Sequence, residues 1–157
     1  MNSVSRITND KYKEIELKFK KKKGLISLRK VDNLIFISGH GPEDRITGVP
    51  IFKGRVGKDI TAEEGYLAAR ECAIIIIAVL RDYLGNLDRI KSIVKVFGMV
   101  NCAESFNDID YVMDGFSDTM MDIFAERGYH TRTIMGTRNL PNKNISVEIE
   151  AIVSVYQ

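Results

Sequence analysis

The chain closes on the stretch SVEIEAIVSV, residues 146–155, in which apolar and polar side chains alternate. Because successive side chains of a β-strand point to opposite faces of a sheet, this stretch predicts a strand with one apolar face. Glu148 and Glu150 then share the other face. The preceding segment, residues 132–136, begins with Arg132, and the turn residues 141–144 predict a hairpin that returns this arginine toward the two acids. The sequence thus predicts a cation beside two carboxylates at one edge of a sheet.

Two separated blocks resemble the same protein family. Residues 132–141 are RTIMGTRNLP, followed by VEIEAI at 147–152, and this pattern resembles the C-terminal signature of the YjgF/RidA family, also known as endoribonuclease L-PSP. Residues 33–42, NLIFISGHGP, are similar to that family's early strand ending in Ser-Gly-Gln-x-Pro. The resemblance covers residues 24–157, because the segments between the two blocks follow the family's order and spacing.

Bulk composition excludes several classes of protein. A chain of 157 residues suffices for a single domain over 1–157 with one real core, and 45% hydrophobic and 28% charged residues are typical of a folded protein. Its 23 basic and 21 acidic residues leave a net charge of +2, which does not indicate a nucleic-acid partner. The N-terminus lacks the continuous apolar region of a secretory signal. We therefore expect a cytoplasmic protein.

Neither the cysteines nor the histidines form a recognisable metal or cofactor motif. Cys72 and Cys102 lie in apolar stretches without Cys-x-x-Cys spacing, so they are predicted to be reduced core thiols. His40 and His130 have no ligand spacing, and the run Gly39-His40-Gly41 lacks the third glycine and the following helix of a phosphate-binding loop. The sequence predicts no metal and no cofactor.

Three segments have helical patterns. Residues 9–23 predict a short amphipathic helix ending in four lysines, within an N-terminal extension over 1–23. The run Thr61-Ala62-Glu63-Glu64 predicts a capping box that begins a helix ending at Leu84, before Gly85. Residues 106–127 predict a second long helix. The stretch from Cys72 to Leu80 is apolar on every side, so we expect a sheet on one side of it and other cover, such as another subunit, on the rest. This stretch is less than half the length that spans a bilayer.

Strands are predicted over residues 25–28, 34–38, 93–100, 132–136 and 146–155, with a short edge strand near 50–52. The order strand, strand, helix, strand, helix, strand, strand predicts an α+β fold in which two long helices pack on one face of a mostly antiparallel sheet. That fold is the chorismate-mutase-like fold of the resembled family, whose members form homotrimers with clefts between subunits. Three sheets meeting at an axis would bury the face that the helices leave open.

The resemblance implies roles for three residues. Arg132 matches the family arginine that binds the carboxylate of an imino or enamine acid, which suits its bidentate donor fork, although a surface ion pair is its ordinary alternative. Glu148 matches the glutamate that activates the attacking water, and its alternative is an outward strand residue. Ser38 matches the serine that hydrogen-bonds the substrate, or else it caps a strand end.

Two positions depart from the family pattern. Leu25 stands where the family's deaminases carry a tyrosine, and His40 replaces the glutamine after Ser-Gly. His40 can donate, accept and titrate near neutral pH, so it either supplies the lost polar function in substrate binding or is an ordinary loop histidine. His130, beside the segment that begins with Arg132, is a further candidate.

Three functions are compatible with these residues. The first is hydrolytic deamination of reactive enamine or imine acids to keto acids and ammonia in an intersubunit cleft, by a hydrolase acting on C–N bonds with Arg132 and Glu148 as catalytic residues. The second is non-catalytic binding of a small carboxylate metabolite by a trimer, which needs only Arg132. The third is an endoribonuclease, which needs a basic track that this near-neutral chain does not offer. We expect neither a membrane nor a nucleic-acid partner.

Overall fold

The computed structural model describes residues 25–157, so the predicted helix over 9–23 lies outside the described residues. The elements follow the predicted order. They are β1 (Leu28–Val31), β2 (Leu34–His40), α2 (Ala62–Leu84), a 3₁₀ turn (Leu87–Arg89), β3 (Ile90–Asn101), α3 (Ile109–Phe124), a second 3₁₀ turn (Ala125–Gly128), β4 (Thr131–Thr137), the tight turn α4 (Pro141–Asn144) and β5 (Val147–Val155).

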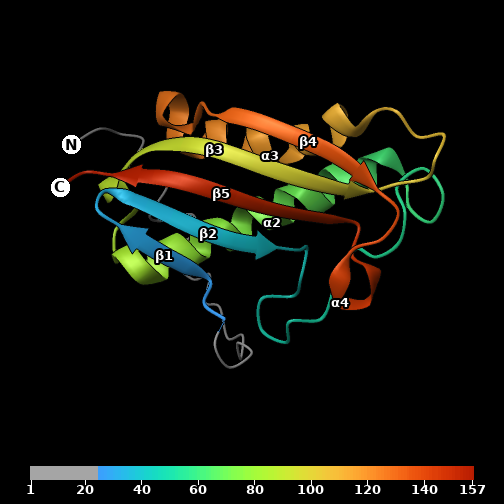
Figure 1. The fold of residues 1–157 in the computed structure, drawn as a ribbon, viewed down its shortest axis with the longest axis horizontal. Coiled ribbons are helices and arrows are strands. Elements are labelled where there is room, and N and C mark those ends of the chain that lie inside the picture. Colours follow the sequence, from blue (N-terminus) through green and yellow to red (C-terminus); the bar gives the residue numbers. More distant parts are fainter. Residues whose placement is uncertain (1–24) are drawn as a thin grey trace.

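The strands form one five-stranded sheet in the order β1-β2-β5-β3-β4. Figure 1 shows the strands side by side, with α2 and α3 together behind them. The pairs β1–β2, β2–β5 and β3–β5 are antiparallel, and β3–β4 is parallel. The predicted α+β class, with two long helices on one face of a mostly antiparallel sheet, is confirmed.

The predicted hairpin between residues 132–136 and the closing strand is wrong. β4 pairs in parallel with β3, and β3 lies between β4 and β5. Both edges of β5 are occupied, by β2 on one side and by β3 on the other. The edge of β3 that remains open is therefore where β4 adds to the sheet. The predicted edge strand near residues 50–52 is also absent. Isolated bridges of Glu43 with Pro50 and of Lys53 with Ile145 lie at this part of the chain instead.

The helix α2 begins and ends as its sequence predicts. The Thr61 hydroxyl accepts a hydrogen bond from the backbone N–H of Glu64 at 3.1 Å, and the Glu64 carboxylate accepts one from the backbone N–H of Thr61 at 2.8 Å. This reciprocal pair satisfies two donors that a helix start leaves open. Gly85 ends the helix with a φ of 73°, a left-handed conformation that glycine adopts without steric cost.

The apolar stretch of α2 is covered within one chain. Every residue from Cys72 to Leu80 is buried, and α2 packs against α3, β2 and β5. The expectation that another subunit covers this stretch is therefore wrong. The open apolar surface lies instead on the face of the sheet opposite the helices, where Phe36 is 44% exposed and Met135 is 46% exposed. Within residues 25–157, no helix is long and apolar enough to cross a membrane.

The two long helices approach each other closely at Gly115. A β-carbon at this position of α3 would overlap the backbone carbonyl oxygen of Tyr66 in α2. A backbone atom cannot swing aside as a side chain can, so even one added methyl group would push the helices apart.

We predict that Gly115→Ala lowers the free energy of unfolding by about 2 kcal/mol or more, because the overlap outweighs the better helix propensity of alanine. Urea denaturation measures this change. Gly136→Ala is the control, since a β-carbon there would meet only the Cys102 sulfur, at 3.1 Å. Equal stability of the two variants would contradict close helix packing at Gly115.

Candidate functional site

Glu148 lies on the face of the sheet that the helices leave open. It pairs across β5 and β3 with Met99, between the buried residues Val147 and Ile149. Its carboxylate packs directly against Gly39 at the end of β2, where a β-carbon would overlap the Oε1 atom. Glycine at position 39 therefore makes the space in which the half-buried Glu148 carboxylate lies.

The surroundings of Glu148 favour its protonated form. Burial raises the pKa of its carboxyl group above the usual value, and the negative charges of Glu43 and Glu150 raise it further. Burial also raises the pKa of Glu43, although a hydrogen bond from Asn142 opposes that shift. Neighbouring half-buried carboxyl groups that oppose each other's ionisation can exchange protons nearer to neutral pH than isolated ones.

Glu43 is a site residue that the sequence did not reveal. It lies in the loop after β2, and its carboxylate accepts a hydrogen bond from the side-chain amide of Asn142 in α4. That contact joins residues 99 positions apart, so no local pattern indicates it. The predicted pairing of Glu148 and Glu150 on one face is confirmed, and Glu43 adds a third acid to this neighbourhood.

The turn that carries Asn142 has an unusual backbone. Asn142, Lys143 and Asn144 have φ values of 48°, 62° and 64°, in the left-handed region that costs energy for residues other than glycine. The fully buried Asn101 holds this turn, because its side-chain amide donates to the Asn144 side chain at 2.9 Å and to the Ile145 carbonyl at 3.1 Å. The hydrogen bonds from Asn101 thus hold the strained turn in a position where Asn142 donates to Glu43.

Arg132 lies on the opposite face of the sheet from Glu148. In the parallel register of β3 and β4 it pairs with the buried Val96, so its side chain faces the helices. The prediction that Arg132 lies beside Glu148 and Glu150 is therefore wrong within one chain. The two halves of the predicted site face away from each other.

The partners of Arg132 come from α3. Its Nη1 atom donates to Asp114 at 2.8 Å and to the Ser117 hydroxyl at 3.0 Å, and its Nη2 atom pairs with Asp110 at 3.3 Å. The Arg132 side chain is 22% exposed. The ion pair that was the alternative role of Arg132 is present, and its partners are two aspartates of α3.

His130 joins this Arg132 cluster through Ser117. Its Nδ1 atom lies 2.7 Å from the Gly128 carbonyl oxygen, and its Nε2 atom lies 3.0 Å from the Ser117 hydroxyl. Burial lowers the pKa of His130, which favours the neutral ring. A carbonyl can only accept, so the single ring proton resides on Nδ1 and Nε2 accepts the hydroxyl proton of Ser117.

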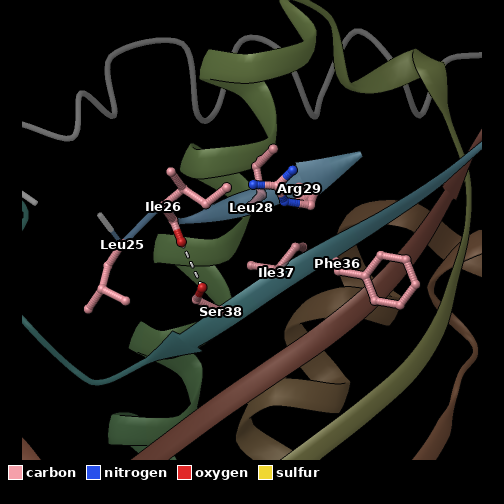
Figure 2. Close-up of a pocket in the computed structure, with 7 residues that line it drawn as sticks. All are labelled: Leu25, Ile26, Leu28, Arg29, Phe36, Ile37 and Ser38. Carbon is pink, nitrogen blue, oxygen red and sulfur yellow. Dashed lines mark hydrogen bonds between the residues drawn. The ribbon is translucent and has the colours of Figure 1, made fainter. Parts of the chain in front are cut away.

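Ser38 and Leu25 line the same surface pocket, about 340 Å³ in volume (Figure 2). The Ser38 hydroxyl points to the segment before β1 and donates to the Ile26 carbonyl at 2.8 Å. This contact matches the strand-end cap that was the alternative for Ser38. Arg29 brings a positive charge to the pocket, whereas Glu148 and Arg132 do not line it.

His40 lies at the irregular end of β2, where it pairs with Ile149. It is half-buried, and Gly39 separates it from Ser38. Ile149 is buried toward the helices, and residues paired across antiparallel strands point to the same face, so His40 faces the helix side of the sheet, away from the Glu148 carboxylate. At the end of β2 it is Gly39 that contacts Glu148, and Arg132 lies apart from both.

In the described part of the chain, no group of three or more histidine, cysteine, aspartate or glutamate side chains is arranged so that it could hold a metal ion. Cys72 and Cys102 are free thiols, and burial raises the pKa of each. The site consists of carboxylates, an arginine, hydroxyls and imidazoles, which suit proton transfer and anion binding.

One family model and several known proteins match this chain over most of its length. The family model described as YjgF/chorismate mutase-like, putative endoribonuclease, matches residues 28–151. Protein TCP17 of Trypanosoma cruzi is 35% identical over 122 residues, which cover 77% of this chain and 74% of TCP17. The crystal structure of Atu1372, a protein of unknown function from Agrobacterium tumefaciens, is similar with a TM-score of 0.85 and 30% identity, over 98% of this chain and 96% of that one. A putative endoribonuclease from Shewanella oneidensis has a TM-score of 0.87 and 26% identity, over 98% of this chain and 100% of that one.

The raised pKa of Glu148 predicts how stability depends on pH. Ionisation of this group opposes folding, so the stability present below its unfolded pKa is lost as the pH rises through the higher folded pKa. Glu148→Gln removes this loss. Compared with the unmodified protein, its free energy of unfolding should therefore increase as the pH rises above the ordinary pKa of a glutamate, about 4.3.

Urea denaturation at several pH values measures this difference. Glu150→Gln, a change of the same kind at an exposed position on the same face, is the control and should show a smaller dependence. The raised pKa of Glu148 would be contradicted if the free energies of unfolding of Glu148→Gln and the unmodified protein differed by the same amount at every pH.

Proposed function

This chain belongs to the YjgF/chorismate mutase-like, putative endoribonuclease family, and on that premise we propose that it hydrolyses reactive enamine or imine acids to keto acids and ammonia. The observation that supports the proposal most is the half-buried Glu148 carboxyl group, packed against Gly39 with a raised pKa. A general base is most effective when its pKa lies near the working pH. Desolvation and neighbouring acids move Glu148 in that direction.

The proposed reaction needs only water and the imine. The Glu148 carboxylate takes a proton from water as the water oxygen bonds to the imine carbon, and the C=N electron pair moves to the nitrogen, which takes up a proton from solvent. The resulting carbinolamine then loses ammonia as its C–N bond breaks and the carbonyl forms. Glu148 returns its proton to the departing nitrogen and the hydroxyl proton of the carbinolamine passes to solvent, so the enzyme ends unchanged.

We propose that the complete site forms between copies of the chain. Arg132 and Glu148 face opposite sides of one sheet, so one copy cannot bring both to the same small substrate. Arg132 is in β4, an edge strand, where a neighbouring copy can approach. A homotrimer that repeats this contact around a closed ring would also cover the open apolar face with Phe36 and Met135. In this arrangement Arg132 anchors the carboxylate, and Glu148 of the adjacent copy activates the water.

Two observations favour a second candidate, the non-catalytic binding of a small carboxylate in the same cleft. The Ser38 hydroxyl already donates to the Ile26 carbonyl, so its proton is not free for a substrate. Leu25 provides no hydroxyl where the family's deaminases have a tyrosine. Binding through Arg132 needs neither group. Endoribonuclease activity, the name that some relatives carry, has no such support in this near-neutral chain.

Replacing the base separates these candidates. Glu148→Gln keeps the shape of the side chain and removes its basicity, so turnover should fall by about a hundredfold or more. The assay follows keto acid released from an enamine that a dehydratase generates in the same solution. Glu150→Gln is the control and should stay within a few-fold of the unmodified protein. Undiminished hydrolysis by Glu148→Gln would contradict the proposed base.

A further inference from the structure

The guanidinium of Arg132 already has two carboxylate partners. Asp110 and Asp114 both pair with it, so one positive and two negative charges leave this group with a net charge of −1. An arginine that serves as an anion anchor is normally left with donors available to the ligand. A substrate carboxylate that reaches the Nη2 side of Arg132 therefore meets a carboxylate of the protein itself, Asp110.

The two contacts differ in strength. Asp114 lies 2.8 Å from Nη1, and its side chain is 47% exposed, whereas Asp110 lies 3.3 Å from Nη2 and is 78% exposed. Exposed ion pairs contribute little to stability, because water competes for both charged groups. Asp110 is thus the partner that a ligand can displace.

The Nη1 side of Arg132 is held more firmly. Ser117, which is buried, accepts a hydrogen bond from Nη1 at 3.0 Å and lies 3.0 Å from His130 Nε2. Asp114 accepts a second hydrogen bond from Nη1. These contacts orient the guanidinium plane whether or not Asp110 is in place.

We propose that Asp110 is a specificity-determining residue, which occupies the Nη2 side of Arg132 until a substrate carboxylate displaces it. Asp114 and Ser117 are positioning residues that hold Nη1. This inference rests on the proposed role of Arg132 as the carboxylate anchor. The two aspartates repel additional negative charge, so the site selects a monocarboxylate whose nitrogen is neutral or cationic, as in an imine acid, and discriminates against dicarboxylates.

Binding of pyruvate to the full-length protein, measured by calorimetry, tests the proposal. Asp110→Asn should lower the Kd for pyruvate roughly two- to fivefold, because it removes a competing exposed ion pair. The decrease should be larger for 2-oxoglutarate, which carries a second carboxylate. Asp114→Asn should raise the Kd for pyruvate, because the guanidinium loses its fixed orientation. In turnover, Asp110→Asn should lower KM by a larger factor than it changes kcat.

Asp122→Asn is the matched control, since this exposed aspartate lies on the same helix about 18 Å further along. It should change the Kd for pyruvate by less than the Asp110 variant does, which separates displacement from a general change in charge. A Kd that rises or stays the same in Asp110→Asn overturns the proposal.

Arg132→Gln separates this inference from the proposed function. If Arg132→Gln abolishes pyruvate binding and Asp110→Asn does not tighten it, the anchor stands and the role of Asp110 is wrong. If pyruvate binds Arg132→Gln as well as it binds the unmodified protein, or binds none of the variants, both the anchor and the role of Asp110 are wrong.

Discussion

Side-chain alternation along β5 is the constraint on which the rest of the structure depends. β5 is the central strand, paired with β2 on one edge and β3 on the other. Its residues Val147, Ile149, Ala151 and Val153 are buried toward the helices, which leaves Glu148 on the open face. A shift of one residue in the pairing register of β5 would bury the carboxylates and expose the core. The packing of α2 and α3 against the sheet therefore also fixes the position of Glu148.

The same alternation in β4 divides the site. Its register with β3 places Arg132 on the helix side, where α3 supplies two aspartates and a serine. The end of β2 and the turn α4 build the other half around the Glu148 carboxylate, with Gly39 providing space and Asn142 contacting Glu43. Each half is well supported by its own contacts, yet the two lie on opposite sides of the sheet. A catalytic role for both residues therefore requires a second copy of the chain.

Those parts of the fold that depend on local patterns could be predicted from the sequence. The capping box at Thr61, the glycine stop at Gly85 and the alternation of residues 147–155 each specify an element without distant contacts. The pairing partner of β4 could not be predicted, because a short strand with mixed polarity carries no information on which neighbour it joins. Glu43 and the aspartates beside Arg132 were missed for the same reason, since their contacts join separate elements.

The cover of α2 shows how a correct pattern can lead to a wrong interpretation. The stretch from Cys72 to Leu80 is apolar all round, as a helix buried on every side should be, but one chain suffices to bury it. The case for a trimer therefore depends on the open face of the sheet and on the divided site.

The central claim is that Arg132 of one copy and Glu148 of another share one substrate. Mixing subunits that carry Arg132→Lys with subunits that carry Glu148→Gln, after unfolding and joint refolding, tests it most directly. Each variant alone should be inactive. Random assembly of equal amounts of the two variants should restore about a quarter of the activity of the unmodified protein. In about a quarter of the clefts, one copy supplies an intact arginine and its neighbour supplies an intact glutamate. A mixture as inactive as its two components, although hybrid oligomers form, would contradict the claim.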